Sequence, residues 1–169
     1  MLIRNIYIRH GVTLYSQQNK FAGRRDIPVV EFDMQMFNDS LKLIESHKPN
    51  ILIHSPLLRA KQTSQLYIER FIFDEVVSEP LLLERDFGVF EGQLKTPENR
   101  KAMEAHPSVE GDITFTERVV SFLDKYGALD INVLVVGHSA FFRKLSELAN
   151  TDKRKLSCCE SSCFDFKRT

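Results

Sequence analysis

Two histidines stand directly after short apolar stretches of the chain. Arg9 and His10 follow the run from Ile6 to Ile8, and His138 follows the run from Val133 to Gly137. A neutral imidazole can attack phosphorus and hold the phosphoryl group covalently, which divides one displacement into two easier steps. A nearby arginine can place positive charge on the oxygens of that group. If the fold brings these residues together, their types indicate phosphoryl transfer. If it does not, the pattern shows only that these strands end in polar residues.

The apolar stretches determine whether these residues meet. Residues 2–8, 50–55 and 132–139 are nearly continuous apolar runs, which favours strands covered on both faces of a parallel sheet. The carboxyl ends of such strands share one edge, where ligands bind in open α/β sheets. His10, His138 and the pair His54-Ser55 are therefore expected at the same edge.

The second of these strands leads into a helix that would add an anion site. Ser55 is a preferred N-cap and Pro56 a preferred first helical residue, so the helix is expected to start at the sheet edge and to run to about residue 71. Free amides at such an N-terminus attract anions. Arg59 lies about one turn further on and could grip a phosphate with two donors, although taken alone it would be read as a surface arginine.

A carboxyl group could supply the proton that phosphoryl transfer requires. Glu84 follows three leucines, and partial burial raises the pKa of a carboxyl group toward the value that a general acid needs near neutral pH. Glu84 could protonate the leaving oxygen and then activate water. The alternative is that Glu84 faces solvent beside Arg85.

Two polar segments are expected to surround the site. Residues 13–26 read as a loop next to His10, in which the candidates to contact a substrate are Ser16, Lys20, Arg24 and Arg25. Residues 93–112 contain Pro97 and Pro107, and the sequence leaves open whether they act as a lid. Specificity is expected to depend on these segments, whose patterns do not name a substrate.

The remaining patterns complete a three-layer fold. Apolar residues recur at helical intervals over 31–47, over 140–148, and from a capping-box spacing at Thr114 to Gly127. Strand-to-helix units in this order predict an α/β/α sandwich with a mostly parallel central sheet. A short strand near residue 76 and a last strand over 161–166 are expected to join this sheet. A chain of 169 residues is expected to form a single domain, residues 1–169.

Composition excludes several classes of protein. Lys plus Arg and Asp plus Glu both number 23, so no basic field argues for nucleic acid and any anion site must be a local cluster. No stretch approaches the roughly 20 apolar residues that span a bilayer, which predicts a cytoplasmic protein without a membrane partner. Oligomeric state is not readable from these patterns.

Nothing in the sequence indicates a metal or a cofactor. There is no P-loop for phosphates, no acidic cluster for magnesium, and no suitably spaced ligand set for zinc. Cys158, Cys159 and Cys163 lie together without a partner motif and are expected to be reduced, structural thiols. The charge of a phosphoryl group must then be met by side chains alone.

Four segments, in order, resemble the histidine phosphatase superfamily, which includes the cofactor-dependent phosphoglycerate mutases. They are Arg9-His10-Gly11 with Thr13, Ser55 to Ala60 with Thr63, Leu82 to Gly92, and Gly137-His138-Ser139 with Arg143. The resemblance implies a phosphoglycerate mutase-like sandwich in which His10 is the phosphorylated nucleophile and Glu84 the proton donor. It also implies a phosphate-binding set, Arg9, Arg59 and His138, and positions for substrate contacts, Ser16, Gly23 and Ser139.

The sequence departs from the family pattern at two positions and in the length of one segment. Val12 stands where Glu is common and Ser16 where Asn is common, so the usual contacts of this loop to a substrate are in doubt. The segment between Glu84 and His138 is much shorter than in the mutases and lacks the paired arginines with which they hold a carboxylate. The chain therefore looks more like the small phosphatases of the superfamily, such as phosphohistidine or ribazole phosphate phosphatases.

The expected function is metal-independent hydrolysis of a phosphate monoester or of phosphohistidine, through a phosphohistidine intermediate at His10. The substrate would be a phosphorylated small molecule or a phosphohistidine protein. One alternative is a phosphoglycerate mutase, which would need bisphosphoglycerate to keep His10 phosphorylated. Another is a non-catalytic module that recognises phosphorylated protein.

Overall fold

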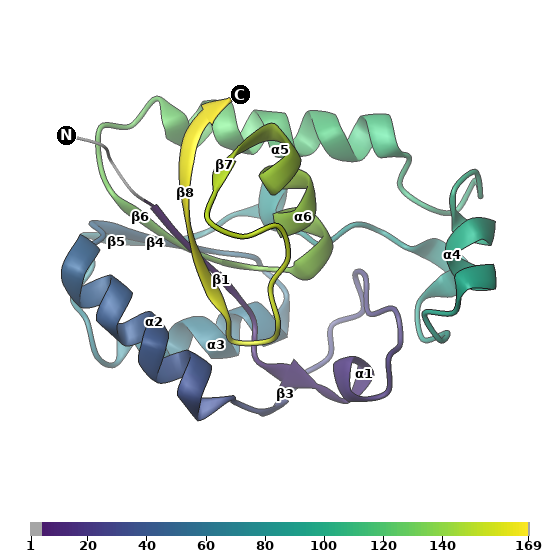
Figure 1. The fold of residues 1–169 in the computed structure, drawn as a ribbon, viewed down its shortest axis with the longest axis horizontal. Helices are drawn as coiled ribbons and strands as arrows, with labels where there is room; N and C mark the ends of the chain where they lie inside the picture. Colours follow the sequence, from purple (N-terminus) through teal and green to yellow (C-terminus); the bar gives the residue numbers. More distant parts are fainter. Residues whose placement is uncertain (1–4, 169) are drawn as a thin grey trace.

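The computed structural model describes residues 5–168, built around a six-stranded sheet in the order β5-β4-β6-β1-β8-β7 (Figure 1). Strands β5, β4, β6 and β1 are parallel, whereas β8 runs antiparallel to β1 and β7 antiparallel to β8. The strands are β1 (Asn5–Arg9), β4 (Ile51–His54), β5 (Glu75–Ser78), β6 (Val133–Gly137), β7 (Ala149–Thr151) and β8 (Ser161–Arg168). The predicted, mostly parallel sheet is confirmed; Leu2 and Ile3, predicted in its first strand, lie outside the described residues.

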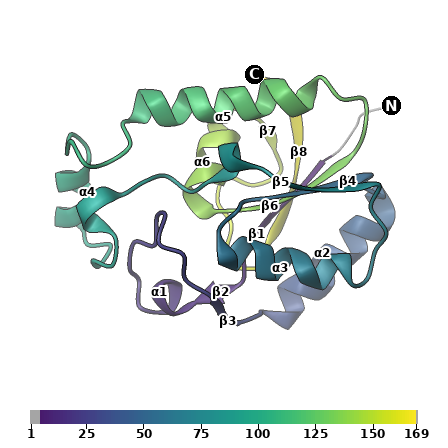
Figure 2. The same cartoon turned by 180° about the vertical axis from the view of Figure 1, so that it is seen from behind.

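Helices cover both faces of the sheet, as Figures 1 and 2 show. Alternate residues of each strand face opposite layers. Ile6 and Ile8 pack in one apolar cluster with α2 (Met34–His47) and α3 (Leu58–Ile68). Tyr7 packs in the other with α5 (Asp112–Gly127) and α6 (Ser139–Leu148). The three layers predicted from the apolar runs are therefore confirmed, and no helix among residues 5–168 is long and apolar enough to cross a bilayer.

Three helices begin at other residues than the sequence predicts. The N-cap of α3 is Leu57, and the carboxylate of Asp26 accepts the Leu58 N–H at 2.6 Å. Ser55 is therefore not the cap, and this helix end is satisfied by a side chain of the preceding loop. Helix α5 follows Gly111, which puts Thr114 inside its first turn, and α2 begins only at Met34, where Asp33 accepts from the Met36 N–H.

The two polar segments and the residues that flank them contain short regular elements that periodicity did not predict. Residues 12–31 form β2 (Val12–Thr13), α1 (Leu14–Gln17) and β3 (Val29–Glu31), and residues 80–112 include two 3-10 turns and α4 (Pro97–Met103). Backbone bonds join the segments: Phe21 N–H to Gln93 O at 2.9 Å, Gly92 N–H to Phe21 O at 2.8 Å and Lys95 N–H to Asn19 O at 2.9 Å. Both lie beyond the same side of the sheet, at the right in Figure 1.

Candidate active site

A cavity of about 280 Å³ lies where β1 and β6 end and the two polar segments meet. Seven of the eight residues predicted for the site line its wall: Arg9, His10, Ser16, Gly23, Arg59, Glu84 and Ser139. The eighth, His138, lies behind the wall, with its ring centroid 5.3 Å from that of His10. The parallel sheet thus brings together residues that are far apart in the sequence, as the strand ends predicted.

His10 is held with one ring nitrogen available. Its Nδ1 lies 2.7 Å from the carbonyl oxygen of Gly11, which can only accept, so Nδ1 carries the proton and Nε2 carries the lone pair. The Gly11 N–H donates to Thr63 Oγ1 at 2.9 Å, which fixes this turn against α3. Burial, and then the charges of Arg59 and Arg9, lower the pKa of His10 well below its usual value. The ring is therefore neutral at pH 7, as a nucleophile must be.

His138 is buried and held by Ser55. Its Nε2 lies 2.7 Å from Ser55 Oγ, which also accepts from the Leu57 N–H at 3.3 Å. Since the hydroxyl can give its own proton to Nε2, this arrangement favours the tautomer with the imidazole proton on Nδ1. Burial, and then the charges of Arg59 and His10, lower the pKa of His138. A neutral His138 can therefore still donate from Nδ1 toward an anion.

Arg59 is buried and ties the loop above the site to α3. Its Nη1 donates to the carbonyl of Arg25 and its Nη2 to the carbonyl of Gly23, both at 2.7 Å. Burial lowers its pKa to about 10, so the guanidinium stays charged at neutral pH. The prediction that Arg59 grips a phosphate with two donors therefore concerns its remaining N–H groups, one on each terminal nitrogen and one on Nε. Gly23, with φ of 53° in the left-handed region, provides the carbonyl that positions Arg59.

Glu84 is buried at the N-terminus of α6, so the alternative that it faces solvent is wrong. Its Oε2 accepts from the Ala140 N–H at 2.9 Å, and its Oε1 accepts from the N–H groups of Phe141 at 3.0 Å and Arg85 at 2.9 Å. The first amides of a helix favour a negative charge. In α6 that charge is the carboxylate of Glu84.

Three buried side-chain nitrogens near His10 have no hydrogen-bond partner within the described residues. They are Nε of Arg9, Nε of Arg59 and Nδ1 of His138. Each belongs to a residue predicted to bind the phosphoryl group. The two arginine nitrogens are donors, and Nδ1 of His138 is a donor in the tautomer that Ser55 favours. Because buried polar groups in proteins are nearly always bonded, such a group of donors points to a ligand that accepts hydrogen bonds.

The polar segments add cations that strand ends could not predict. Lys20, Lys95 and Arg100 come from these segments and Arg143 from α6, and we call these four residues the outer wall of the cavity. The only acidic lining residue among those described is Glu84. Lys20 was among the loop residues predicted to contact a substrate. Of the other two cations predicted there, Arg24 pairs with Glu110 and Arg25 donates to the hydroxyl of Tyr15. The hydroxyl of Ser16 donates to the Thr13 carbonyl at 2.8 Å, so it also stabilises its own turn.

Metal-ligand types do not gather at this site. Among residues 5–168, no group of three or more His, Cys, Asp or Glu side chains is arranged to hold a metal ion. Cys159 is buried, its Sγ accepts from the Asp33 N–H at 3.4 Å, and burial raises the pKa of its thiol to about 11. These contacts describe a structural thiol, as the sequence predicts for this residue.

The two active-site imidazoles are expected to titrate below the usual histidine pKa of about 6.5. Between their lowered pKa values and 6.5 the unfolded chain binds protons that the folded chain does not. The contribution of these rings to the free energy of unfolding is therefore complete above pH 6.5 and is lost as the pH falls below it. An NMR titration of the ring signals, assigned with His10→Ala, measures both values. A ring that titrates at 6.5 or higher contradicts this description.

Comparisons with known proteins place the chain in a family. Residues 6–160 match the histidine phosphatase superfamily (branch 1). The chain is 29% identical over 149 residues to the uncharacterized phosphatase PhoE of Bacillus subtilis (strain 168), a match that covers 86% of this chain and 77% of that protein.

Solved structures show the same fold. A phosphoglycerate mutase from Thermus thermophilus superposes with a TM-score of 0.74 at 24% identity, over 98% of this chain and 94% of the mutase. A mycobacterial glucosyl-3-phosphoglycerate phosphatase, in a complex with VO3, superposes with a TM-score of 0.70 at 21% identity, over 85% of this chain and 79% of that one. With the family match over residues 6–160, the chain belongs to the histidine phosphatase superfamily.

Proposed function

We propose that this chain is a phosphatase that hydrolyses a phosphate monoester or phosphohistidine through a covalent intermediate on His10 Nε2. The observation that carries the proposal is the set of three unpartnered buried nitrogens, on Arg9, Arg59 and His138, together with a neutral His10. A transferring phosphoryl group carries its charge on three equatorial oxygens, which accept such hydrogen bonds. The family membership and the phosphatase-named relative support the same reaction class.

In the first step, Nε2 of His10 forms a bond to phosphorus while the bond from phosphorus to the leaving oxygen breaks. Glu84 lines the same cavity and passes a proton to that oxygen. The proton reaches Glu84 from the substrate or from solvent, and the Glu84 oxygens are held in place by the N–H groups of Arg85, Ala140 and Phe141. The two arginines and His138 stabilise the charge on the equatorial oxygens.

In the second step, a water oxygen bonds to phosphorus and the bond from phosphorus to His10 Nε2 breaks. Glu84, which gave up its proton in the first step, now takes one from the water. Inorganic phosphate leaves and the neutral imidazole of His10 is restored. One carboxyl group thus transfers the proton in both steps, and side chains stabilise the charge of the phosphoryl group in each step.

The outer wall favours a substrate with negative charge beyond the transferred phosphoryl group. Its four cations, Lys20, Lys95, Arg100 and Arg143, take part in none of the ion pairs among the described residues. Lys95 and Arg100 both lie over the ring of the buried Phe21, at 5.9 and 5.6 Å from its centroid. Burial, and then the charges of Arg9, Arg100 and Arg143, lower the pKa of Lys95. A second anionic group would relieve this repulsion.

Arg100→Gln is expected to weaken selection for such substrates. Its kcat/KM for 3-phosphoglycerate should fall by about tenfold, because a charge-assisted hydrogen bond contributes about 1.5–3 kcal/mol. Its kcat/KM for glycerol 3-phosphate, which has no carboxylate, should change by less than about twofold. Steady-state kinetics with this matched pair of substrates measure the difference.

Lys101→Gln is the control, since Lys101 follows Arg100 on α4 but is not a lining residue. It removes the same charge from the helix and should leave kcat/KM for both substrates unchanged. An equal loss for Arg100→Gln and Lys101→Gln would mean that only the overall charge of the segment matters.

The proposed function is tested by phosphate release from a panel of phosphorylated metabolites, p-nitrophenyl phosphate and a phosphohistidine protein, in buffer with EDTA. Release without added bisphosphoglycerate supports the phosphatase. Interconversion of phosphoglycerates with little release would indicate the mutase. Binding of phosphorylated protein without turnover of any substrate would indicate the non-catalytic module. In the first case, vanadate is expected to inhibit by binding between His10, Arg59 and His138.

A further inference from the structure

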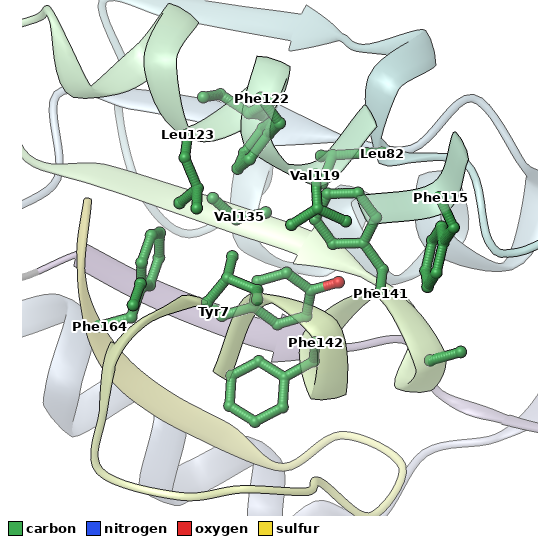
Figure 3. Close-up of a cluster of buried hydrophobic side chains, with 14 of the residues drawn as sticks. Tyr7, Leu82, Phe115, Val119, Phe122, Leu123, Val135, Phe141, Phe142 and Phe164 are labelled. Atoms are coloured by element: carbon green, nitrogen blue, oxygen red, sulfur yellow. The ribbon is translucent and has the colours of Figure 1, made fainter. Parts of the chain in front are cut away.

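Tyr7 lies in the middle of β1, three residues before His10, and its side chain is completely buried. Figure 3 shows it within the aromatic cluster between the sheet and helices α5 and α6. Its ring lies 5.0 Å from that of Phe142, stacks on Phe141 at 6.4 Å and meets Phe164 edge-on at 6.4 Å. A hydroxyl in such surroundings is costly unless it is hydrogen-bonded.

The hydroxyl of Tyr7 bonds to both backbone groups of one residue, His138. It accepts from the His138 N–H at 2.8 Å and donates to the His138 carbonyl at 3.1 Å. His138 is the N-cap of α6, at the point where extended backbone (φ −124°, ψ 166°) turns into helix. One side chain from the strand that leads to His10 therefore fixes the backbone of the second active-site histidine.

Gly137 provides the space for this contact. A Cβ atom at Gly137 would stand 2.2 Å from the Tyr7 hydroxyl and 2.8 Å from its Cζ. Gly137 has no positive φ, so its small size rather than its backbone freedom is required here. Tyr7 and Gly137, which lie on the paired strands β1 and β6, thus form a matched pair.

The contact bears on two groups of the proposed chemistry, the ring of His138 and the carboxylate of Glu84. The ring of His138 is held by Ser55, and the amides of Ala140 and Phe141, the second and third residues of α6, hold Glu84. A shift of the His138 backbone would therefore move the Nδ1 donor and the carboxylate together. Burial, and then the charge of Glu84, raise the pKa of Tyr7 well above its usual value, so the hydroxyl keeps the proton that it donates.

We propose that Tyr7 is a positioning residue of the active site, whose hydroxyl sets the place of His138, and through α6 the place of Glu84, relative to His10. This inference rests on the proposed function for its effect on catalysis. Its structural part, the placement of the His138 ring, can be tested without turnover.

Tyr7→Phe removes the hydroxyl and keeps the aromatic ring. We expect kcat for p-nitrophenyl phosphate to fall by about 10- to 100-fold, as small misplacements of reacting groups commonly cause. KM should change by less than about threefold, because Arg9 and Arg59 remain. The NMR signals of the His138 ring should shift and broaden, and the rate at which His10 is phosphorylated should fall with kcat.

Phe122→Leu is the matched control for lost packing. Phe122 is fully buried in the same cluster, its ring contacts those of Tyr126, Phe141 and Phe166, and its side chain has no polar atom that could bond to the His138 backbone. It should lower the melting temperature at least as much as Tyr7→Phe while kcat and the His138 signals stay as in the wild type. If both variants lower kcat in proportion to their stability, or if Tyr7→Phe keeps kcat within about twofold, Tyr7 is only a packing residue.

Gly137→Ala tests the same contact from the other side and serves if Tyr7→Phe does not fold. Alone it should displace the hydroxyl, shift the His138 ring signals and lower kcat similarly. Where Tyr7→Phe folds, Gly137→Ala should lower kcat by a smaller factor in that background, because the contact at 2.2 Å is gone while the one to Cζ at 2.8 Å remains. If the losses of kcat caused by Gly137→Ala and Tyr7→Phe are independent and multiply in the double variant, the proposal is wrong. If the wild type forms no phosphoenzyme, the proposed function fails, whereas the His138 signals of these variants still decide the role of Tyr7.

Discussion

His10→Ala is expected to abolish phosphate release from every substrate and to form no phosphoenzyme. The imidazole of His10 lines the cavity with its Nε2 lone pair available, because Nδ1 donates to the Gly11 carbonyl at 2.7 Å. Alanine removes the only nucleophile that the proposed mechanism uses, so the loss does not depend on the leaving group. Acid-labile phosphate is not retained by the quenched variant, whereas the wild type retains it. Rapid-quench experiments with radiolabelled phosphate measure this difference.

His54→Ala is a matched control for the loss of a buried imidazole. His54 ends β4 much as His10 follows β1, it is 6% exposed against 5%, and its Nδ1 bonds to the carbonyl of the next residue at 2.9 Å. It is not a lining residue of the cavity. His54→Ala should therefore still form phosphoenzyme and release phosphate. A phosphoenzyme in His10→Ala, or its loss in His54→Ala alone, would place the nucleophile at another histidine.

The sheet edge could be predicted from sequence because it depends on local patterns. Apolar runs that end in polar residues identify buried strands, and parallel pairing then brings their carboxyl ends together without knowledge of the loops. Arg9 and His10 line the cavity for this reason. The helix starts were less predictable, because caps can come from distant residues. The carboxylate of Asp26 accepts the N–H of Leu58, whereas Ser55, which was expected to be the cap, bonds to His138.

The places of Lys95 and Arg100 in the outer wall could not be predicted, because they depend on contacts between two irregular segments. Lys95 and Arg100 reach the cavity through the backbone bonds that join residues 19–21 to residues 92–95, and such bonds have no sequence period. The contact from Tyr7 to His138 was equally hidden. In the sequence Tyr7 is one apolar residue of a strand, and only the structure shows where its hydroxyl goes.

Glu84→Gln is expected to slow hydrolysis of alkyl phosphates by about 10²–10⁴, the usual contribution of general acid catalysis. An alkoxide must be protonated as it leaves, whereas p-nitrophenolate leaves without help. With p-nitrophenyl phosphate the variant should therefore still phosphorylate His10. Its second step should be slow, since Glu84 also activates the water, so nitrophenolate should appear as a burst matched to the enzyme concentration while phosphoenzyme accumulates.

The hydrogen bonds of Glu84 call for a control, because a glutamine can offer only one acceptor oxygen to the three amides that the carboxylate now accepts. Glu91→Gln provides it: Oε1 of Glu91 accepts from the N–H groups of Arg24 at 2.8 Å and Phe87 at 3.2 Å, yet Glu91 is not a lining residue. A loss caused by altered amide bonding should affect alkyl and nitrophenyl esters alike, so Glu91→Gln should show no dependence on the leaving group. The ratio of the two rates in Glu84→Gln separates proton transfer from structure. If Glu84→Gln loses the nitrophenolate burst as completely as His10→Ala does, Glu84 holds the N-terminus of α6 in place and the proton comes from another group.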